Sequence, residues 1–301
     1  MTPPAVPVAA LPSLAVPPRS GLSAAEFQEL ALVIRRISGL VLGPEQDYLL
    51  VTRLAPLLRR HGLADLGALL RRLRGPGAAA LAAEMATATA THETSFFRDE
   101  IPFRHLAETA LPRLAAARGR EARLKLWSAA CSTGQEAFSL AILAQESRAA
   151  MGGRGVDILG TDLSSGVVAK ASEGFFSDFE AARGLSPARR ARWFETVPGG
   201  LRAISALRAD CRFVTANLVE NPPSAGGFDV VMLRNLLIYL DQPTKERVVE
   251  SCAQRMAPEA LLYLGAAEVL LSLRSRLVPL AGCHGAYRLD SPAAARFWGA
   301  A

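Results

Sequence analysis

The chain has 301 residues, of which 50% are hydrophobic and 21% are charged, a composition typical of folded globular proteins. Its net charge is +6, no apolar stretch reaches the roughly 18 to 20 residues that span a bilayer, and no basic start of a signal peptide is present. The four cysteines form no CxxC pair and no histidine stands at zinc-finger spacing, which argues against a disulfide scaffold or a structural zinc. We expect a cytoplasmic protein without membrane insertion and without a metal.

The first 90 residues predict a tail followed by a small helical domain. Residues 1–20 are rich in proline and alanine and nearly uncharged, so we expect a flexible tail. From residue 21 to 90 apolar residues recur at helical spacing, and Ser23 with Glu26 makes a capping-box pattern. The predicted helices cover residues 23–38, 44–60, 63–74 and 78–89. They form an all-α N-terminal domain.

Most of the excess positive charge lies in this helical region. Between residues 51 and 77 six arginines face one acidic residue, Asp65, a local balance of 6 − 1 = +5. These arginines are Arg53, Arg59, Arg60, Arg71, Arg72 and Arg74. Two interpretations stay open: a surface that attracts nucleic acid, membrane or an acidic protein, and a solvated helix face. The missing aromatic residues argue against single-stranded nucleic acid.

Short apolar runs alternate with helical patterns after residue 123, following a linker and helix at residues 91–122. The predicted strands are 124–128, 156–161, 228–233 and 261–265, and the predicted helices between them are 136–149, 164–172 and 244–256. This α/β pattern predicts a largely parallel sheet with helices on both faces, in a domain of residues 123–301. In such sheets the ligand lies beyond the carboxyl ends of the strands.

Polar residues follow several of these predicted strands. The first strand runs into AACSTGQE, which contains neither a GxGxxG nor a Walker motif. Asp162 follows the second strand, where it can accept hydrogen bonds from both ribose hydroxyls of an adenosine or can cap the next helix. Asn217, Arg234 and Asn235 also follow apolar runs, so we expect them to converge on a bound ligand.

Five motifs together carry a resemblance to a known family. In chain order they are THETSFFRD (91–99), LWSAACSTGQEAFSLAIL (126–143), GTDLS (160–164), FVTANLVE (213–220) and FDVVMLRNLLIYLD (228–241). They resemble the CheR family, the chemoreceptor glutamate methyltransferases that use S-adenosylmethionine, and the likeness runs from about residue 21 to 289. It implies a Rossmann-like methyltransferase domain with a small antiparallel β-subdomain inserted at residues 199–214, in which LRAISAL and CRFVTA are two strands.

The resemblance also assigns site residues. Arg98 and Tyr239 are the implied catalytic pair: Arg98 offers a planar fork to a carboxylate of the cofactor or substrate, and Tyr239 places its hydroxyl at the methyl-transfer centre. Taken alone, Arg98 fits a surface ion pair with Asp99 or Glu100, and Tyr239 fits a core position. The implied cofactor-binding residues are His92, Thr94, Arg98, Glu136, Asp162, Asn217, Leu218, Arg234 and Asn235. Asp162 would hold the ribose of S-adenosylmethionine, whose product is S-adenosylhomocysteine.

The implied chemistry needs no general base. A glutamate side chain has an ordinary pKa near 4.3 and is ionised at neutral pH, so it can attack a methyl sulfonium directly. The enzyme must supply proximity, alignment and exclusion of water. Orientation alone can lower the activation barrier by about 7 to 11 kcal/mol. This agrees with a sequence whose four histidines form no ligand cluster.

The sequence departs from the family pattern at a few places. His92 stands where the family usually has asparagine, Gln135 replaces a glutamate, and LGAAE keeps Glu268 but lacks the histidine and serine of LGHSE. The stretch ETVPGG is short, which predicts docking on chemoreceptor helical bundles without a pentapeptide tether. The Arg-rich helices would then face the acidic methylation helices of the receptor. We expect a monomer.

Two other functions remain open on the sequence. The departures at His92 and GAAE fit a catalytically weak module that binds S-adenosylmethionine or S-adenosylhomocysteine and regulates a partner. The second alternative is a methyltransferase of the same fold that acts on a different carboxylate, because fold alone does not fix the substrate.

Overall fold

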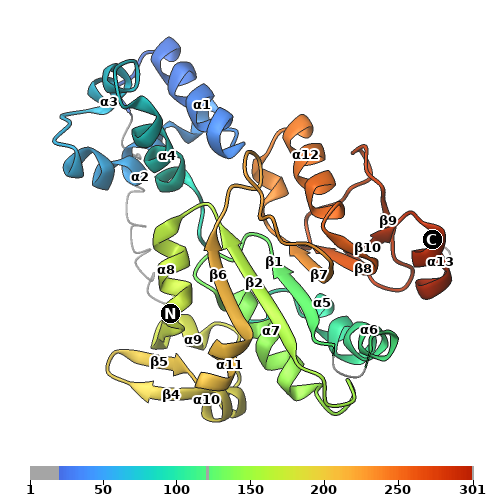
Figure 1. The fold of residues 1–301 in the computed structure, drawn as a ribbon. Coiled ribbons are helices and arrows are strands. Elements are labelled where there is room, and N and C mark those ends of the chain that lie inside the picture. Colours follow the sequence, from blue (N-terminus) through green and yellow to red (C-terminus); the bar gives the residue numbers. More distant parts are fainter. Residues whose placement is uncertain (1–19, 120–121, 300–301) are drawn as a thin grey trace, which may run out of the picture.

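The structure is a computed structural model that describes residues 20–119 and 122–299. A unit of short helices lies at one end of the molecule, and a twisted sheet flanked by helices forms the rest (Figure 1). The predicted tail of residues 1–20 lies outside the described residues except for Ser20. Within the described part, no helix is long and apolar enough to cross a membrane.

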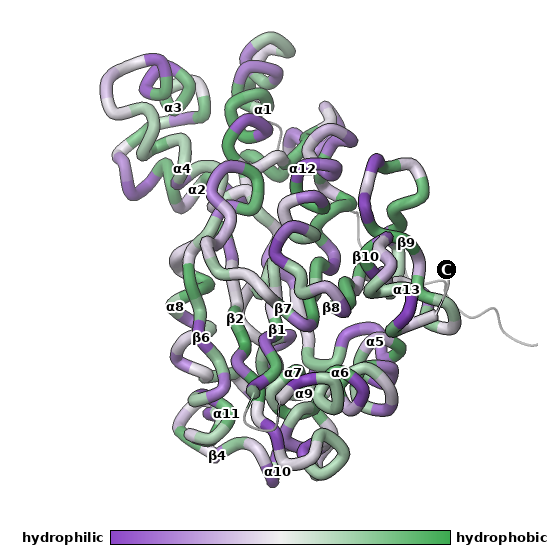
Figure 2. Tube along the Cα trace, turned by 45° about the vertical axis from the view of Figure 1, so that its right-hand side comes forward, coloured by the Kyte–Doolittle hydropathy of each residue, from purple (hydrophilic) through white to green (hydrophobic). Residues whose placement is uncertain are grey.

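The helical unit contains the four predicted helices, which are confirmed with small shifts of their ends. The capping box forms as predicted, because the Ser23 hydroxyl accepts from the amide of Glu26 and the Glu26 carboxylate accepts from the amide of Ser23. Polar and apolar residues alternate along the first helix (Figure 2), and its apolar face is buried against the others. The elements are α1 (Ala24–Ser38), η1 (Pro44–Gln46), α2 (Asp47–Arg60), α3 (Leu66–Leu73) and α4 (Ala78–Thr89).

The predicted α/β unit is a seven-stranded sheet of order β6-β2-β1-β7-β8-β10-β9. Its strands are β1 (Leu124–Ser128), β2 (Val156–Asp162), β6 (Cys211–Thr215), β7 (Phe228–Leu233), β8 (Met256–Leu264), β9 (Leu277–Pro279) and β10 (Ala286–Leu289). The first five in spatial order pair in parallel, and β10 runs antiparallel to both its neighbours. The strand order reverses between β1 and β7, and such a switch point is where open α/β sheets bind their ligands.

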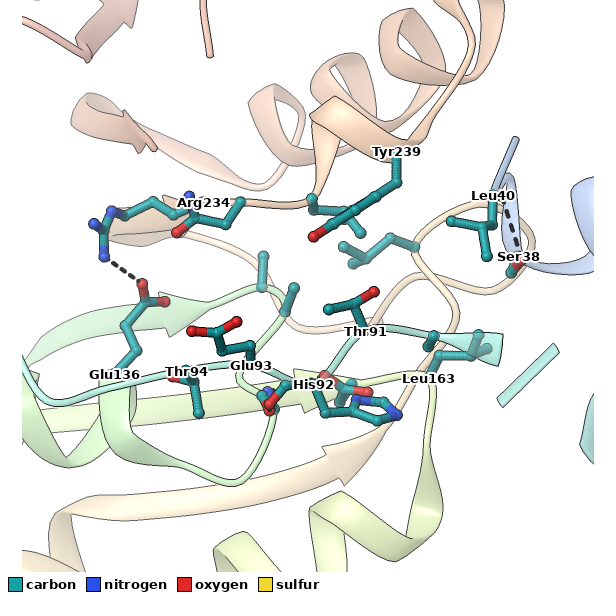
Figure 3. Close-up of a pocket in the computed structure, with 18 of the residues that line it drawn as sticks. Ser38, Leu40, Thr91, His92, Glu93, Thr94, Glu136, Leu163, Arg234 and Tyr239 are labelled. Carbon is teal, nitrogen blue, oxygen red and sulfur yellow. Dashed lines mark hydrogen bonds and ion pairs between the residues drawn. The ribbon is translucent and has the colours of Figure 1, made fainter. Parts of the chain in front are cut away.

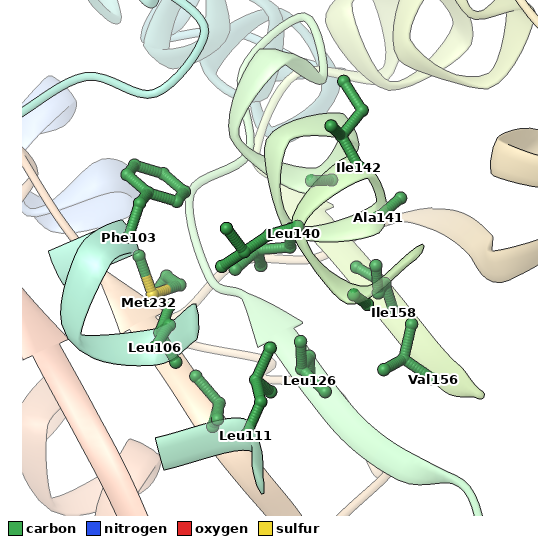
Figure 4. Close-up of a cluster of buried hydrophobic side chains, with 14 of the residues drawn as sticks. Phe103, Leu106, Leu111, Leu126, Leu140, Ala141, Ile142, Val156, Ile158 and Met232 are labelled. Atoms are coloured by element: carbon green, nitrogen blue, oxygen red, sulfur yellow. The ribbon is translucent and has the colours of Figure 1, made fainter. Parts of the chain in front are cut away.

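Alternate residues of each central strand face two different cores. Leu126 of β1 packs in one core with Ile158 and Met232, while the adjacent Trp127 packs in the other with Leu159 and Val231. Figure 4 shows the first core between the sheet and the helices on that face. Those helices are α5 (Glu100–His105), α6 (Leu111–Ala117) and α7 (Gln135–Glu146), with a π-helical turn joining α5 to α6. The second core lies under α12 (Gln242–Ala253).

The predicted position of the small β-subdomain is wrong. Its three strands lie at β3 (Phe175–Ser177), β4 (Phe194–Val197) and β5 (Gly200–Ala203), so the unit begins well before residue 199. LRAISAL remains a strand only to Ala203. CRFVT is not part of the subdomain, because it forms β6 and pairs in parallel with β2 at the edge of the main sheet. As an edge strand exposed along much of its length, β6 lacks the continuous apolar run of a central strand.

Five further helices complete the α/β unit within the described residues. The helix α8 packs against β2 and β6, α9 and α10 pack on the three-stranded subdomain, and α11 packs against α7 and the β2–β6 edge of the main sheet. The last helix packs on β8 and β10 at the C-terminal edge of the sheet. Their bounds are α8 (Ser165–Glu173), α9 (Asp178–Ala182), α10 (Pro187–Trp193), α11 (Ser205–Asp210) and α13 (Pro292–Trp298).

The helical unit is joined to the sheet by the loop after α1. The amide of Val41 donates to the carbonyl oxygen of Tyr239 at 2.9 Å, and the side-chain amide of Asn217 donates to the carbonyl oxygen of Ile37 at 2.7 Å. In the same loop Gly39 has φ 76°, and an added Cβ would stand 2.7 Å from Thr244. The loop is therefore packed closely on the α/β part of the chain.

Candidate active site

A cavity opens at the switch point between β1 and β7, above the carboxyl ends of the parallel strands. It encloses about 1060 Å³ of space between protein atoms, including the part open to solvent. Figure 3 shows side chains from the loop after α1, from the connector of residues 90–98 and from the strand ends pointing into it. All ten residues predicted for the site line this cavity: His92, Thr94, Arg98, Glu136, Asp162, Asn217, Leu218, Arg234, Asn235 and Tyr239.

Asp162 ends β2 and holds the turn after β1. One carboxylate oxygen accepts from the amide of Ser132 at 2.9 Å, and the other accepts from the amide of Ser164 at 3.0 Å. The helix that follows is capped by Ser164 and not by Asp162, so the capping interpretation of Asp162 is wrong. Each oxygen accepts a single protein hydrogen bond within the described residues, which leaves lone pairs for a ligand diol.

Glu136, at the start of α7, forms a buried ion pair with Arg234 at the end of β7. The Arg234 guanidinium donates to one carboxylate oxygen at 2.9 Å, and the hydroxyl of Ser128 donates to the other at 2.7 Å. Burial raises the pKa of the Glu136 carboxyl, while the positive charge of Arg234 and the two hydrogen bonds oppose this rise. Arg234 itself is only 5% exposed. The pair therefore forms the inner wall of the cavity.

Arg98 lies in the connector between the helical unit and α5, and it is half-buried. Its guanidinium donates a long hydrogen bond of 3.3 Å to the carbonyl oxygen of Glu93. Among the residues that the structure describes it forms no ion pair, so the surface bridge to Asp99 or Glu100 is not formed. Most donors of Arg98 are therefore available to a ligand carboxylate.

The remaining predicted residues on the far side of the cavity come from two neighbouring loops. Leu218 is buried on the cavity wall, next to Asn217, whose side chain bridges to the helical unit. Tyr239 ends η3 (Leu237–Tyr239), where it packs against the core of the helical unit and also lines the cavity. Asn235 has φ 57°, and its backbone N–H donates to the Glu268 carboxylate at 2.7 Å.

His92 and Thr94 line the cavity from the connector, as Figure 3 shows. The His92 carbonyl oxygen accepts from the Ser132 hydroxyl at 2.8 Å, which ties the connector to the turn after β1. Within the described part of the chain the His92 ring forms no hydrogen bond. This contact is made by the backbone of residue 92 and therefore does not depend on its side chain.

Sequence reasoning missed several residues of the site. Ser38 and Leu40 line the cavity from the helical unit, a contribution that only the tertiary contact of the loop after α1 reveals. Ser132 binds both Asp162 and the connector, and its place in the CSTG turn was a usable signal. Glu268, the residue kept in LGAAE, accepts from the amides of Asn235 and Gly265 and so supports the loop after β7. No cluster of metal-ligating side chains occurs in the described residues.

Comparison with known proteins identifies the family. The model of the CheR methyltransferase SAM binding domain matches residues 92–282, and that of the CheR methyltransferase all-alpha domain matches residues 25–87. The chain belongs to the CheR methyltransferase family. The chemotaxis protein methyltransferase 1 of Pseudomonas aeruginosa is 36% identical over 253 residues, which cover 83% of this chain and 92% of that protein.

Further relatives agree with this assignment. A chemotaxis protein methyltransferase of Pseudomonas putida is 32% identical and covers 82% of this chain and 91% of its own length. One from Vibrio parahaemolyticus is 33% identical and covers 85% of this chain and 93% of its own length. This member of the CheR family is therefore an S-adenosylmethionine-dependent methyltransferase.

The lining of the cavity of this CheR-family chain fits the cofactor in charge. The lining contains two arginines and three carboxylates, a formal balance of 2 − 3 = −1 that suits a ligand with a positive sulfonium. The charged residues of the lining are Arg98, Arg234, Glu93, Glu136 and Asp162.

Proposed function

We propose that this protein transfers a methyl group from S-adenosylmethionine to glutamate side chains of chemoreceptor helical bundles, giving glutamyl methyl esters. The observation that carries the proposal is the cavity itself, because residues from all five sequence motifs line one space at the switch point of the sheet. The relatives named chemotaxis protein methyltransferase support a chemoreceptor as the substrate.

The residues that hold the cofactor in this proposal are those that line the cavity. Asp162 binds the ribose hydroxyls with its free lone pairs, and Asn217 and Leu218 flank the adenine. Glu136 has both oxygens engaged by Ser128 and Arg234, so its contribution is to fix the wall at the amino-acid end. His92, Thr94, Arg98, Arg234 and Asn235 complete the site. When bound, the cofactor supplies an electrophilic methyl group on a sulfonium.

The protein's own groups orient the acceptor glutamate carboxylate and exclude water from it. Arg98 offers an unpaired guanidinium fork to a carboxylate, and the Tyr239 hydroxyl lies across the cavity from the connector (Figure 3). A glutamate carboxylate is ionised at neutral pH, so no residue has to remove a proton. Alignment and exclusion of water are what the site contributes.

The helical unit presents a basic surface for the acidic partner. Arg59, Arg71 and Arg72 are exposed on α2 and α3, and none of them forms an ion pair within the described residues. The hairpin between β4 and β5 has only Pro198 and Gly199 in its turn. This short hairpin supports receptor docking without a pentapeptide tether.

The test combines calorimetry with receptor labelling. Isothermal titration with S-adenosylhomocysteine should show binding to the wild type and at least about tenfold weaker binding to Asp162→Ala, since two hydrogen bonds to a charged acceptor are lost. Receptor-rich membranes incubated with methyl-labelled cofactor should gain base-labile label. Binding without label would favour a regulatory module or another substrate, and no binding at all would contradict the assignment of the cavity.

A further inference from the structure

The turn that carries Arg98 is strained on both sides. Phe97 has φ 47° and Asp99 has φ 56°, so two of three consecutive residues occupy the left-handed region without being glycine. Such conformations are unfavourable for residues other than glycine and persist where surrounding contacts hold them. The contacts that hold this turn therefore decide where the Arg98 side chain points.

Asp99 occupies the N-cap position of α5 but does not cap it. A capping aspartate has extended backbone angles and accepts from an amide of the first turn. Asp99 instead has φ 56° and ψ 85°, and its side chain makes no capping hydrogen bond. Its carboxylate accepts from the guanidinium of Arg234 at 2.8 Å. Asp99 thus gives up a local helix-capping contact for a contact with a residue 135 positions away.

Arg234 gives this contact a rigid base. The same nitrogen donates to the backbone carbonyl oxygen of Arg98 at 2.6 Å, and the other terminal nitrogen donates to Glu136. Because the side chain of Arg234 is only 2% exposed and leaves the end of a central strand, it cannot follow a moving turn. The Arg98–Asp99 segment is therefore fixed to the sheet through one guanidinium.

Arg98 has little else to direct it. Its guanidinium makes one long hydrogen bond to the connector, and it has no ion pair among the residues that the structure describes. Asp99, in contrast, does not line the cavity. We propose that Asp99 is a positioning residue, whose ion pair with Arg234 fixes the strained turn and aims Arg98 into the active site.

This inference rests on the proposed function, because it needs Arg98 to act on cofactor or substrate. The experiment compares Asp99→Asn with Arg98→Lys in the receptor methylation assay and in calorimetry with S-adenosylhomocysteine. Asp99→Asn should lower methyl transfer by about tenfold, through the same parameter, kcat or KM, that Arg98→Lys changes. In the Arg98→Lys background, Asp99→Asn should have less than about a twofold further effect, because the two changes remove one function. Asp99→Glu, which keeps the charge, should recover most of the activity.

Glu100→Gln is the matched control. Glu100 is the next residue, is exposed, and forms no ion pair within the described residues, so the same loss of charge there should leave activity and melting temperature unchanged. If Asp99→Asn behaves like Glu100→Gln, or lowers activity to the same extent in the Arg98→Lys background, the inference is wrong while the proposed function stands. If Arg98→Lys and Arg98→Ala retain wild-type turnover, the proposed role of Arg98 fails first.

Discussion

Arginines serve two different purposes in this molecule, and the helical unit and the cavity show the contrast. The exposed arginines of α2, α3 and the residue after α3 either pair with a nearby carboxylate, as Arg60 does with Glu84 and Arg74 with Glu29, or face solvent. At the cavity Arg234 is buried and makes three hydrogen bonds, while Arg98 lies beside it with its donors largely free.

The difference shows that burial and partners, and not the number of arginines, set the role of each. Exposed pairs contribute about 0 to 1 kcal/mol, whereas removing one partner of a buried pair costs about 3 to 5 kcal/mol. A count of charges along the sequence gives both kinds equal weight. Four predictions test the contrast, from the largest expected effect to the smallest.

Removing the guanidinium of Arg98 should have the largest effect. Arg98→Ala is expected to lower kcat/KM for receptor methylation by about a thousandfold or more, because the acceptor loses its orienting charge, while the melting temperature stays near that of the wild type. Arg59→Ala, an exposed arginine of the helical unit, is the matched control and should change kcat/KM by less than about threefold. A similar loss of kcat/KM in both variants would contradict the difference that we draw between the arginines of the cavity and those of the helical unit.

Displacing the Arg98 turn by adding a side chain at Gly184, which packs against Phe96, should have the next largest effect. Gly184 has φ 96°, and an added Cβ would stand 1.9 Å from the carbonyl oxygen of Phe96. Gly184→Ala should therefore displace the turn, destabilise the protein by about 2 to 3 kcal/mol and lower methyl transfer by about tenfold or more. Gly153 has a similar φ of 82°, and a Cβ added there would meet nothing within 4 Å. Gly153→Ala therefore reports the cost of backbone strain alone, and denaturant unfolding of both variants gives the additional cost of the steric clash at Gly184.

Reversing exposed charges on the helical unit should have a smaller effect that depends on salt. Changing Arg59 and Arg71 together to glutamate is expected to slow receptor methylation by about threefold to tenfold at low salt and by less above about 0.15 M. The affinity for S-adenosylhomocysteine, measured by calorimetry, should stay unchanged. A change in that affinity would mean that the patch supports the fold instead of the encounter with the receptor.

Acidification should separate the two regions by the direction of their pKa shifts. Burial raises the pKa of Glu136 above its ordinary value of 4.5, whereas hydrogen bonds lower the pKa of Glu29, paired with Arg74, and of Glu84, paired with His61 and Arg60. Carbon NMR of the carboxyl groups should show Glu136 taking up its proton first as the pH falls. An inflection for Glu136 below those of Glu29 and Glu84 would contradict this order.

The stability contributions follow with opposite signs. The native state binds a proton at Glu136 before the unfolded state does, so the contribution of this residue to the free energy of unfolding grows as pH falls toward 4.5 and is lost as pH rises through the raised pKa. The contributions of Glu29 and Glu84 are present above 4.5 and are lost below it. Glu136→Gln should remove only the first dependence.

Much of the site could be predicted from the sequence because its residues sit in contiguous motifs at strand ends. Asp162, Arg234 and Asn235 follow apolar runs, and the carboxyl ends of parallel strands converge at one edge. Ser38 and Leu40 could not be found in this way, because they reach the cavity through the packing of a separate helical unit. The role that we propose for Asp99 was hidden because an aspartate before a helix normally predicts a cap.

The fold was predicted with one clear error, and its cause is physical. Central strands such as β1 are buried on both faces and stand out as apolar runs. Phe175–Ser177 is only three residues long, and β6 is an exposed edge strand, so neither carries that signal. Of the six arginines counted between residues 51 and 77, Arg53 is turned toward the connector, where it donates to Thr91 at 3.0 Å.

The close fit around Gly39 limits how this protein can be recombined with its relatives. An added Cβ there would stand 2.7 Å from Thr244 and 3.0 Å from Leu240, on the loop that carries Tyr239. A chimera that grafts a foreign helical unit onto this methyltransferase unit must therefore bring a residue without a side chain at that position, or the graft will pull the wall of the cavity out of place. The helical unit and the sheet occupy separate stretches of the sequence, but their contact surfaces are complementary. A chimera should therefore take both units from the same protein.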